Sequence, residues 1–266
     1  MQEERLPLDV DESRPSAARI YDYFLGGKDN FACDRAVADQ LMRIAPETPA
    51  MARASRAFLG RAVRFIAEQG VRQFIDIGTG LPTRSNVHEI AQAVAPSTRV
   101  VYVDNDPAVL AHARALLDDN PQTAVVEADL RDPARLLNDP DLERLIDFGR
   151  PVGLIMVGIV YFLTEVDRPF DVVRILRDAL PSGSYLAMTH VVADDRLAQL
   201  GQAQELYRSF TKQTGTGLRS RDEVTAFFHG LDLVEPGLVP TQNWRNPTPG
   251  DPSIPQWILG AVARKP

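Results

Sequence analysis

The chain has 266 residues, and its 44% hydrophobic and 24% charged residues are typical of a globular protein rather than a disordered one. Its 29 basic and 36 acidic residues give a net charge of −7, which disfavours a nucleic-acid partner because such proteins usually carry a basic face. The single cysteine, Cys33, excludes an internal disulfide, and the four histidines form no ligand cluster, so we expect no metal site.

The N-terminus and the apolar runs predict neither a signal peptide nor a membrane helix. The first residues, Met-Gln-Glu-Glu-Arg, are polar, and no apolar segment follows them. The longest apolar run, residues 152–163, has twelve residues, whereas a membrane helix needs about 18. We therefore expect a cytoplasmic protein without a membrane partner, with residues 1–15 as a loose tail.

Two helical segments are predicted near the N-terminus. The first covers residues 16–43 and is interrupted at Gly26-Gly27, and the second covers residues 52–69. Phe58 and Ile66 share an apolar face of the second segment, and Gly70 suits its end. We assign residues 1–70 as a helical cap or lid and residues 71–266 as the core of one domain, 1–266.

The remaining sequence alternates between short apolar runs and helical patterns. Such alternation is typical of βαβ units and predicts a mainly parallel sheet. The predicted strands cover residues 73–77, 99–103, 124–127, 152–160, 184–191, 231–235 and 257–263, and the predicted helices cover 86–94, 106–117, 167–180, 194–212 and 221–230. A proline-rich loop joins the last two strands, and it either covers a site or packs on the surface.

A glycine-containing loop, Asp76-Ile-Gly-Thr-Gly80, directly follows the first predicted strand. Glycines at this point let the chain turn sharply and let a ligand approach the backbone. The helix predicted near Asn86 would direct its free N–H groups toward that ligand. The motif alone is a weak signal, because glycines after a strand often serve only a turn.

Two further acids follow the second and third predicted strands. Asp104 lies 24 residues after Gly80, where a carboxylate can accept hydrogen bonds from ribose hydroxyls. Asp129 is either an acceptor for an adenine amino group, with Leu130 against the ring, or a solvated loop acid. Because ligands of open α/β sheets lie at the carboxyl ends of the strands, we predict a nucleotide-like site built from Asp76, Gly78, Thr79, Gly80, Asp104, Asn105, Asp129 and Leu130.

Two cofactors with an adenosine moiety fit this loop differently. A dinucleotide motif has a third glycine where this chain has Thr83, and Asp76 would repel a pyrophosphate. S-adenosylmethionine has no phosphate and carries an ammonium and a sulfonium, which suit an acid before the glycines. The loop N–H groups remain available to its carboxylate.

Taken together, these segments resemble class I S-adenosylmethionine-dependent methyltransferases. Residues 19–31, Arg-Ile-Tyr-Asp-Tyr-Phe-Leu-Gly-Gly-Lys-Asp-Asn-Phe, are also similar to the N-terminal signature of one bacterial group, the S-adenosyl methyltransferase family. Further similar blocks are residues 73–82, 101–107, 128–133, 183–186 and 235–237, so the resemblance extends from about residue 16 to residue 265.

The resemblance implies a fold, a cofactor and part of a site. The fold is α/β, a Rossmann-like, doubly wound sheet of seven strands with the last strand antiparallel, plus an N-terminal helical extension. The cofactor is S-adenosylmethionine, bound by Asp76, Gly78, Gly80, Asp104 and Asp129. In this family the fourth strand often ends in histidine where this chain has Tyr161, which puts general-base catalysis by histidine in doubt.

The N-terminal signature supplies candidates for a lid on the acceptor side. Polar and aromatic residues surround the flexible Gly26-Gly27, and they are Tyr21, Asp22, Tyr23, Lys28, Asp29 and Asn30. We expect this segment to close over the cofactor. The alternative is a helix that packs Ile20, Phe24 and Leu25 into the core with its polar groups in solvent.

The catalytic residues stay unknown, with Tyr161, His190, Tyr21 and Tyr23 as candidates. Tyr161 and His190 are predicted at the ends of the fourth and fifth strands, where Tyr161 is either a substrate contact or a core residue. His190 is either a base or a hydrogen-bonded structural residue. Arg219, Arg221 and Arg245 either hold an acidic acceptor or are solvated, and we expect solvation for each.

The sequence thus favours a methyltransferase whose acceptor is an unknown small molecule. A non-catalytic S-adenosylmethionine-binding or regulatory protein is the first alternative, because fold does not fix function. An NAD-dependent oxidoreductase is disfavoured by Asp76 and Thr83. A nucleic-acid acceptor is disfavoured by the charge and by the absence of an Asn-Pro-Pro-Tyr-like segment after the fourth strand, where the chain reads Gly158-Ile-Val-Tyr161.

Overall fold

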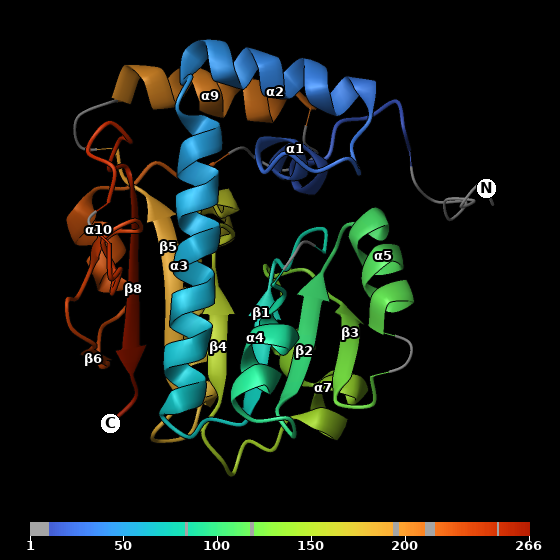
Figure 1. The fold of residues 1–266 in the computed structure, drawn as a ribbon, viewed down its shortest axis with the longest axis vertical. Coiled ribbons are helices and arrows are strands. Elements are labelled where there is room, and N and C mark those ends of the chain that lie inside the picture. Colours follow the sequence, from blue (N-terminus) through green and yellow to red (C-terminus); the bar gives the residue numbers. More distant parts are fainter. Residues whose placement is uncertain (1–10, 83–84, 118–119, 194–196, 211–215, 249) are drawn as a thin grey trace.

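A central sheet organises the chain. The computed structural model describes residues 11–82, 85–117, 120–193, 197–210, 216–248 and 250–266 (Figure 1). Its strands are β1 (Gln73–Ile77), β2 (Arg99–Asp104), β3 (Thr123–Glu127), β4 (Gly153–Met156), β5 (Tyr185–Val191), β6 (Asp232–Leu233), β7 (Val239–Pro240) and β8 (Ile258–Arg264).

The strand order confirms the predicted Rossmann-like fold. Seven strands follow one another as β3-β2-β1-β4-β5-β8-β6, and the two-residue β7 pairs with β8 as an eighth. Strands β1 to β5 are parallel, and β8 runs antiparallel to β5. The order reverses between β1 and β4, so the carboxyl edge of β1 lies at the point where such sheets bind ligands.

Helices surround this sheet. They are α1 (Ala17–Phe24), α2 (Ala32–Ile44), α3 (Thr48–Glu68), α4 (Val87–Val94), α5 (Pro107–Leu117), α6 (Pro133–Leu137), α7 (Pro140–Leu145), α8 (Pro169–Ala179), α9 (Leu197–Phe210) and α10 (Arg221–Ala226), with 3₁₀ turns η1 (Val160–Phe162) and η2 (Glu165–Asp167). Proline begins α5, α6, α7 and α8, where its missing N–H costs no helical hydrogen bond. Within the described residues, no helix is long and apolar enough to cross a bilayer.

The sheet is covered on both faces by apolar side chains. Alternate residues of β1 point to opposite faces, so Phe74 packs with Phe58 and Ile66 of α3, whereas Ile75 packs with Leu142 of α7. The fully buried Trp244 also joins the α3 side, with its ring 5.4 Å from that of Phe58 in an edge-on arrangement. Burial on both faces explains why the central strands are continuous apolar runs.

A third apolar cluster forms the cap. Ile20 and Phe24 of α1, Leu41 of α2 and Ala52 of α3 pack against one another, and Tyr207 of α9 packs against them. Figure 1 shows α1, α2 and α9 lying across the carboxyl ends of the parallel strands. The cap therefore contains α9 as well as residues from the predicted cap, 1–70.

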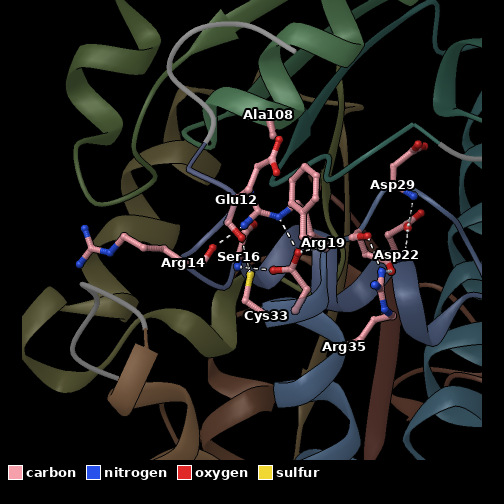
Figure 2. A network of polar contacts seen from close by, with 12 residues as sticks. Glu12, Arg14, Ser16, Arg19, Asp22, Asp29, Cys33, Arg35 and Ala108 are labelled. Atoms are coloured by element: carbon pink, nitrogen blue, oxygen red, sulfur yellow. Dashed lines mark hydrogen bonds and ion pairs between the residues drawn. The ribbon is translucent and has the colours of Figure 1, made fainter. Parts of the chain in front are cut away.

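The carboxylate of Asp34 holds the cap and the preceding segment together. It is fully buried, and its two oxygens accept hydrogen bonds from the Arg19 Nε at 2.8 Å, the Ser16 N–H at 2.9 Å and the Phe31 N–H at 2.8 Å. The Arg19 guanidinium also donates to the carbonyls of Asp11 and Arg14. Figure 2 shows Arg19 beside Ser16 and the chain at Glu12 and Arg14.

Several predicted boundaries differ from the structure. The fourth strand ends at Met156, and Gly158 turns the chain at φ +74° into η1, so the apolar run 152–160 covers a strand and a turn. The predicted helix 221–230 ends at Ala226, and the predicted strand 231–235 shortens to β6. Helices α6 and α7 were not predicted. Thr83, Pro249 and the predicted ends of helix 194–212 lie outside the described residues.

We predict that Asp34→Ala lowers the free energy of unfolding by about 3–5 kcal/mol, because it leaves the Arg19 guanidinium buried without its carboxylate. Urea unfolding followed by circular dichroism measures the change. Asp178→Ala is the control. It removes an ion pair whose carboxylate is 55% exposed, so it should cost less than about 1 kcal/mol. Equal losses in the two variants would contradict a structural role for Asp34.

Candidate functional site

A cavity of about 500 Å³ lies between the carboxyl edge of the sheet and the cap. Its floor is the loop after β1, where Gly78 and Gly80 have φ angles of +70° and +66°. A Cβ atom added at Gly78 would lie 2.6 Å from the Ile159 side chain, so both the backbone angle and the packing require glycine there. The predicted glycine loop thus forms one wall of a real cavity.

Asp76 is a buried carboxylate at the end of β1 and lines this cavity. Its pKa is raised to about 6, chiefly by burial and to a smaller extent by the nearby Asp104 charge. The Thr79 hydroxyl, which donates to Asp76 at 3.0 Å, and the Arg56 charge act in the opposite direction. The buried acid is therefore poised to accept a cationic group.

Asp104 ends β2 and is held rigidly by the backbone. One carboxylate oxygen accepts the Gly80 N–H at 3.0 Å, and the other accepts the N–H groups of Asn105 at 2.8 Å and Asp106 at 3.0 Å. Burial nevertheless raises the pKa of Asp104. These bonds link the glycine loop to β2 and leave lone pairs of Asp104 for a ligand in the cavity.

A smaller cavity of about 40 Å³ adjoins the first. Gly78, Asp104, Asn105 and Ile159 line both, and the predicted residues Asp129 and Leu130 line the smaller one. Asp129 forms an ion pair with Arg131, whose hydrogen bonds lower the Asp129 pKa. The structure therefore brings all eight predicted cofactor residues to one edge of the sheet, with Asp129 and Leu130 at one end.

The segment before α1 forms a wall that sequence reasoning missed. Asp11, Arg14 and Pro15, expected to belong to a loose tail, line the large cavity together with Ser16. The Ser16 hydroxyl donates to Asp106, whose other oxygen caps α5 through the Ala108 N–H at 2.8 Å. Nothing in residues 11–15 signals this contact, because the hydrogen bonds that hold them come from Arg19 and Cys33, which follow later in the chain.

Arg56 of α3 is a second residue that the sequence did not single out. It lines the same cavity as Asp76, and its guanidinium donates to the Ser85 carbonyl at 3.2 Å and to the Asn86 side chain at 3.5 Å. Among the described residues it has no carboxylate ion-pair partner. The cavity thus places the Arg56 guanidinium and the buried Asp76 carboxylate in one lining.

The lid candidates separate into two groups. Tyr21 lines the large cavity, and its hydroxyl donates to the Ala52 carbonyl at 3.1 Å. Asp22 instead accepts from the Asp29 N–H and the Asn30 amide, at 3.0 and 2.9 Å, and a Cβ on Gly27 would meet its carboxylate at 1.9 Å. These three polar residues close the Gly26-Gly27 turn.

Lys28 and Tyr23, like the three polar residues of the turn, line neither the large cavity nor the smaller one. Lys28 is exposed at the turn, and Tyr23 packs on the apolar cap cluster. The N-terminal part of the chain that lines the large cavity is therefore Asp11, residues 14–19 and Tyr21 rather than the polar turn.

Tyr161 and His190 lie near each other, with ring centroids 6.4 Å apart. Tyr161 lies on η1 beyond β4, lines the large cavity and forms a hydrogen bond with Tyr207. Burial raises the pKa of Tyr161, so its hydroxyl stays protonated. His190 lies on β5, with Nδ1 2.6 Å from the Val191 carbonyl and Nε2 3.0 Å from the Arg219 guanidinium.

Those two contacts determine which ring nitrogen of His190 carries the proton. Arg219 can only donate, so Nε2 accepts and Nδ1 carries the proton. Burial lowers the His190 pKa to about 4, and the Arg219 charge contributes in the same direction. The imidazole lone pair that a base would use is occupied.

Arg219 is not solvated, contrary to the expectation from sequence. It is 1% exposed, donates to the Leu163 carbonyl at 2.8 Å and to Glu165 at 3.1 Å, and lies over the Phe227 ring. This burial becomes possible because His190 contacts one terminal nitrogen of the guanidinium, and the Leu163 carbonyl and the Glu165 carboxylate accept from the other. Within the described residues, no group of three or more His, Cys, Asp or Glu side chains could hold a metal ion.

Comparison with protein families gives one match, to the S-adenosyl methyltransferase family, over residues 3–266. The chain belongs to this family. Comparison with curated proteins gives no match.

Two solved structures are similar to this chain over almost its whole length. A DUF574 family protein from Streptomyces avermitilis MA-4680 is 44% identical with a TM-score of 0.91, covering 96% of this chain and 99% of its own. A protein from Thermobifida fusca YX is also 44% identical with a TM-score of 0.91, covering 97% and 98%. The N-methyltransferase NodS from Bradyrhizobium japonicum WM9, at 14% identity and a TM-score of 0.50, shares the fold over 80% of this chain and 97% of its own.

We predict that Arg219→Met raises the His190 pKa above its value of about 4, because the variant removes a positive charge and frees the Nε2 lone pair. The pKa should stay below the ordinary histidine value, since burial is the larger cause. NMR titration of the His190 ring measures it. Arg174→Met, on an exposed part of α8, is the control and should leave the titration unchanged. An unchanged titration in Arg219→Met would show that burial alone sets this pKa.

Proposed function

We propose that this chain is an S-adenosylmethionine-dependent methyltransferase that acts on a small-molecule acceptor. The observation that supports it most is the pairing of a buried carboxylate, Asp76, with a guanidinium, Arg56, in one cavity beside the glycine loop. A free amino acid carries an ammonium and a carboxylate, and these two side chains have the charges to bind both. We assign Asp76 to the ammonium and Arg56, with loop N–H groups, to the carboxylate.

The rest of the cofactor matches the remaining polar groups. Asp104 has lone pairs directed at the cavity and would accept the ribose hydroxyls. The smaller cavity, between Leu130 and Ile159 and beside Asp129, would take the adenine ring. The combined space is within the usual range for a cofactor site, because the large cavity alone measures about 500 Å³.

The same residues disfavour a dinucleotide. A pyrophosphate at the glycine loop would face the carboxylate of Asp76, which is shielded from water. Charge repulsion at the phosphate site therefore disfavours the oxidoreductase alternative. The family to which the chain belongs disfavours it as well.

The residues near the reacting end position the acceptor rather than activate it. S-adenosylmethionine supplies the chemistry when bound, since its sulfonium releases a methyl group and leaves as a neutral thioether. Tyr21, Tyr161 and Tyr207 are neutral hydroxyl groups around this end, and burial raises the pKa of each. Positioning of this kind can lower a barrier by roughly 7–11 kcal/mol. A general base is needed only for an acceptor that starts protonated, and we assign none to His190.

Calorimetric titration with S-adenosylmethionine, S-adenosylhomocysteine and NAD tests the proposal directly. Micromolar binding of the two sulfur nucleotides without NAD binding supports it. NAD binding would favour the oxidoreductase. Cofactor binding without methyl transfer in a broad acceptor screen would favour the non-catalytic alternative.

We predict that Asp104→Ala weakens S-adenosylmethionine binding by more than tenfold while the fold stays intact, because the variant removes the ribose acceptor and the partner of the Gly80 N–H. Calorimetry measures the affinity, and circular dichroism checks the fold. Asp141→Ala, on a carboxylate 59% exposed, is the matched control. An unchanged affinity for Asp104→Ala would mean that the ribose lies elsewhere.

We also predict that S-adenosylmethionine affinity falls as the pH drops below about 6. Ammonium binding requires ionised Asp76, whose pKa burial raises to about 6, so the affinity should be nearly constant above that pH. Below it, each pH unit should weaken binding by up to about tenfold, as expected for one proton. Titrations at pH 7.5, 6 and 5 measure the effect. Asp76→Asn should bind weakly throughout and lose most of this dependence, and a pH-independent wild type would refute the assignment.

A further inference from the structure

A second cavity of about 140 Å³ lies behind the first, under the cap. Its walls come from α1, α2, α3 and α9 and from the end of β5, where Val191 and His190 lie. Most of these elements are distant in sequence, and the apolar cap cluster holds them together.

This cap cavity meets the cofactor cavity at a shared wall. Tyr21, Gly158, Tyr161 and Tyr207 line both spaces. Gly158 lies just beyond β4, at the carboxyl edge of the sheet, and its N–H donates to the Thr189 hydroxyl at 2.9 Å. A molecule bound in the cap cavity would therefore border the cofactor cavity at the three tyrosine rings and at the Gly158 backbone, which carries no side chain.

The cap cavity carries no formal charge among the described residues. Its lining includes no Asp, Glu, Lys or Arg, and its apolar part includes Phe24, Leu41, Met51, Leu200 and Leu218. His190 is neutral there, since both ring nitrogens are engaged and burial keeps its pKa low. A charged ligand would lose its hydration without gaining a partner, which is costly, whereas an apolar one would gain from burial.

The volume limits the size of the occupant. An engineered apolar cavity of about 150 Å³ in another protein binds benzene, so about 140 Å³ corresponds to roughly one six-membered ring. Hydroxyl groups of Thr189, Thr216 and the shared tyrosines provide polar contacts at the margin.

We infer that the cap cavity binds the reacting end of the methyl acceptor, a compact uncharged group about the size of one aromatic ring. This inference rests on the proposed methyltransferase function and adds the acceptor class. In the transfer, an acceptor lone pair forms the new bond to carbon while the sulfur–carbon electron pair returns to sulfur. The positive charge passes to the acceptor atom, which loses it with a proton to water if it carries one.

Ring-sized probes test the inference on the full chain. Phenol, benzoate and benzylammonium have similar sizes and differ in charge at pH 7.5. We expect phenol to bind the protein saturated with S-adenosylhomocysteine at least tenfold more tightly than either ion, measured by ligand-observed NMR titration. Benzoate or benzylammonium binding as tightly as phenol would overturn the inference.

Variants on α9 locate the probe. Ala203→Phe places a ring in the cap cavity and should abolish phenol binding, whereas Gln202→Phe adds the same ring at an exposed position and should leave it unchanged. Leu200→Ala enlarges the cavity and should keep phenol binding and strengthen 2-naphthol binding at least fivefold. Because Ala203 and Leu200 line the cap cavity and not the cofactor cavity, neither change should alter S-adenosylhomocysteine affinity.

The two proposals fail in distinguishable ways. If the wild type does not bind S-adenosylhomocysteine, the proposed function fails, and phenol binding to the ligand-free protein still tests the charge and size of the cavity through Ala203→Phe. If S-adenosylhomocysteine binds but phenol binds equally to Ala203→Phe and Gln202→Phe, the acceptor inference fails while the cofactor assignment stands.

Discussion

The buried ion pair between Arg19 and Asp34 fixes the position of the cap, and both cavities depend on that position. Asp34 gathers three donors from α1, from the segment before it and from the start of α2. Arg19 then holds the carbonyls of Asp11 and Arg14, so Asp11 and residues 14–16 lie against the cofactor cavity. A buried pair seldom adds much net stability, but the loss of one partner is costly, which makes it suited to specifying one arrangement. Here the specified arrangement is a wall of a binding site.

A second constraint is the burial of acids at the carboxyl edge of the sheet. Burial raises the Asp76 pKa to about 6, well above its value of 3.8 in an unfolded chain. The folded state therefore holds the proton more tightly, and Asp76 reduces stability as the pH rises from about 4 to 6. A fold that keeps such a residue in a cavity gives up stability for binding, as functional sites commonly do. A cationic ligand group would remove this cost, so ligand binding and stability should be coupled.

The sequence predicted the sheet and the acids well because both follow local rules. Apolar runs separated by helical segments determine a parallel sheet, and the acids at strand ends, Asp76, Asp104 and Asp129, come together by topology alone. Arg56, Ser16 and Arg219 escaped prediction because their roles depend on contacts with distant segments. Arg219 shows the limit clearly, since a lone arginine in a polar stretch is usually solvated, and only the fold brings His190, Leu163 and Glu165 around it. The contribution of α9 to the cap is another long-range result.

The distribution of charge across the shared tyrosine wall connects these features. On one side lie Asp76, Asp104 and Arg56, and on the other side the described lining is uncharged. A neutral acceptor that takes a methyl group from a cation spreads a single positive charge over a larger volume at the transition state. Water stabilises a concentrated charge better than a dispersed one, so it stabilises the sulfonium more than the transition state. An apolar environment gives the sulfonium less of this advantage, and it therefore opposes the dispersal of charge less than water would. The uncharged cap cavity would then favour uncharged acceptors in the reaction as well as in binding.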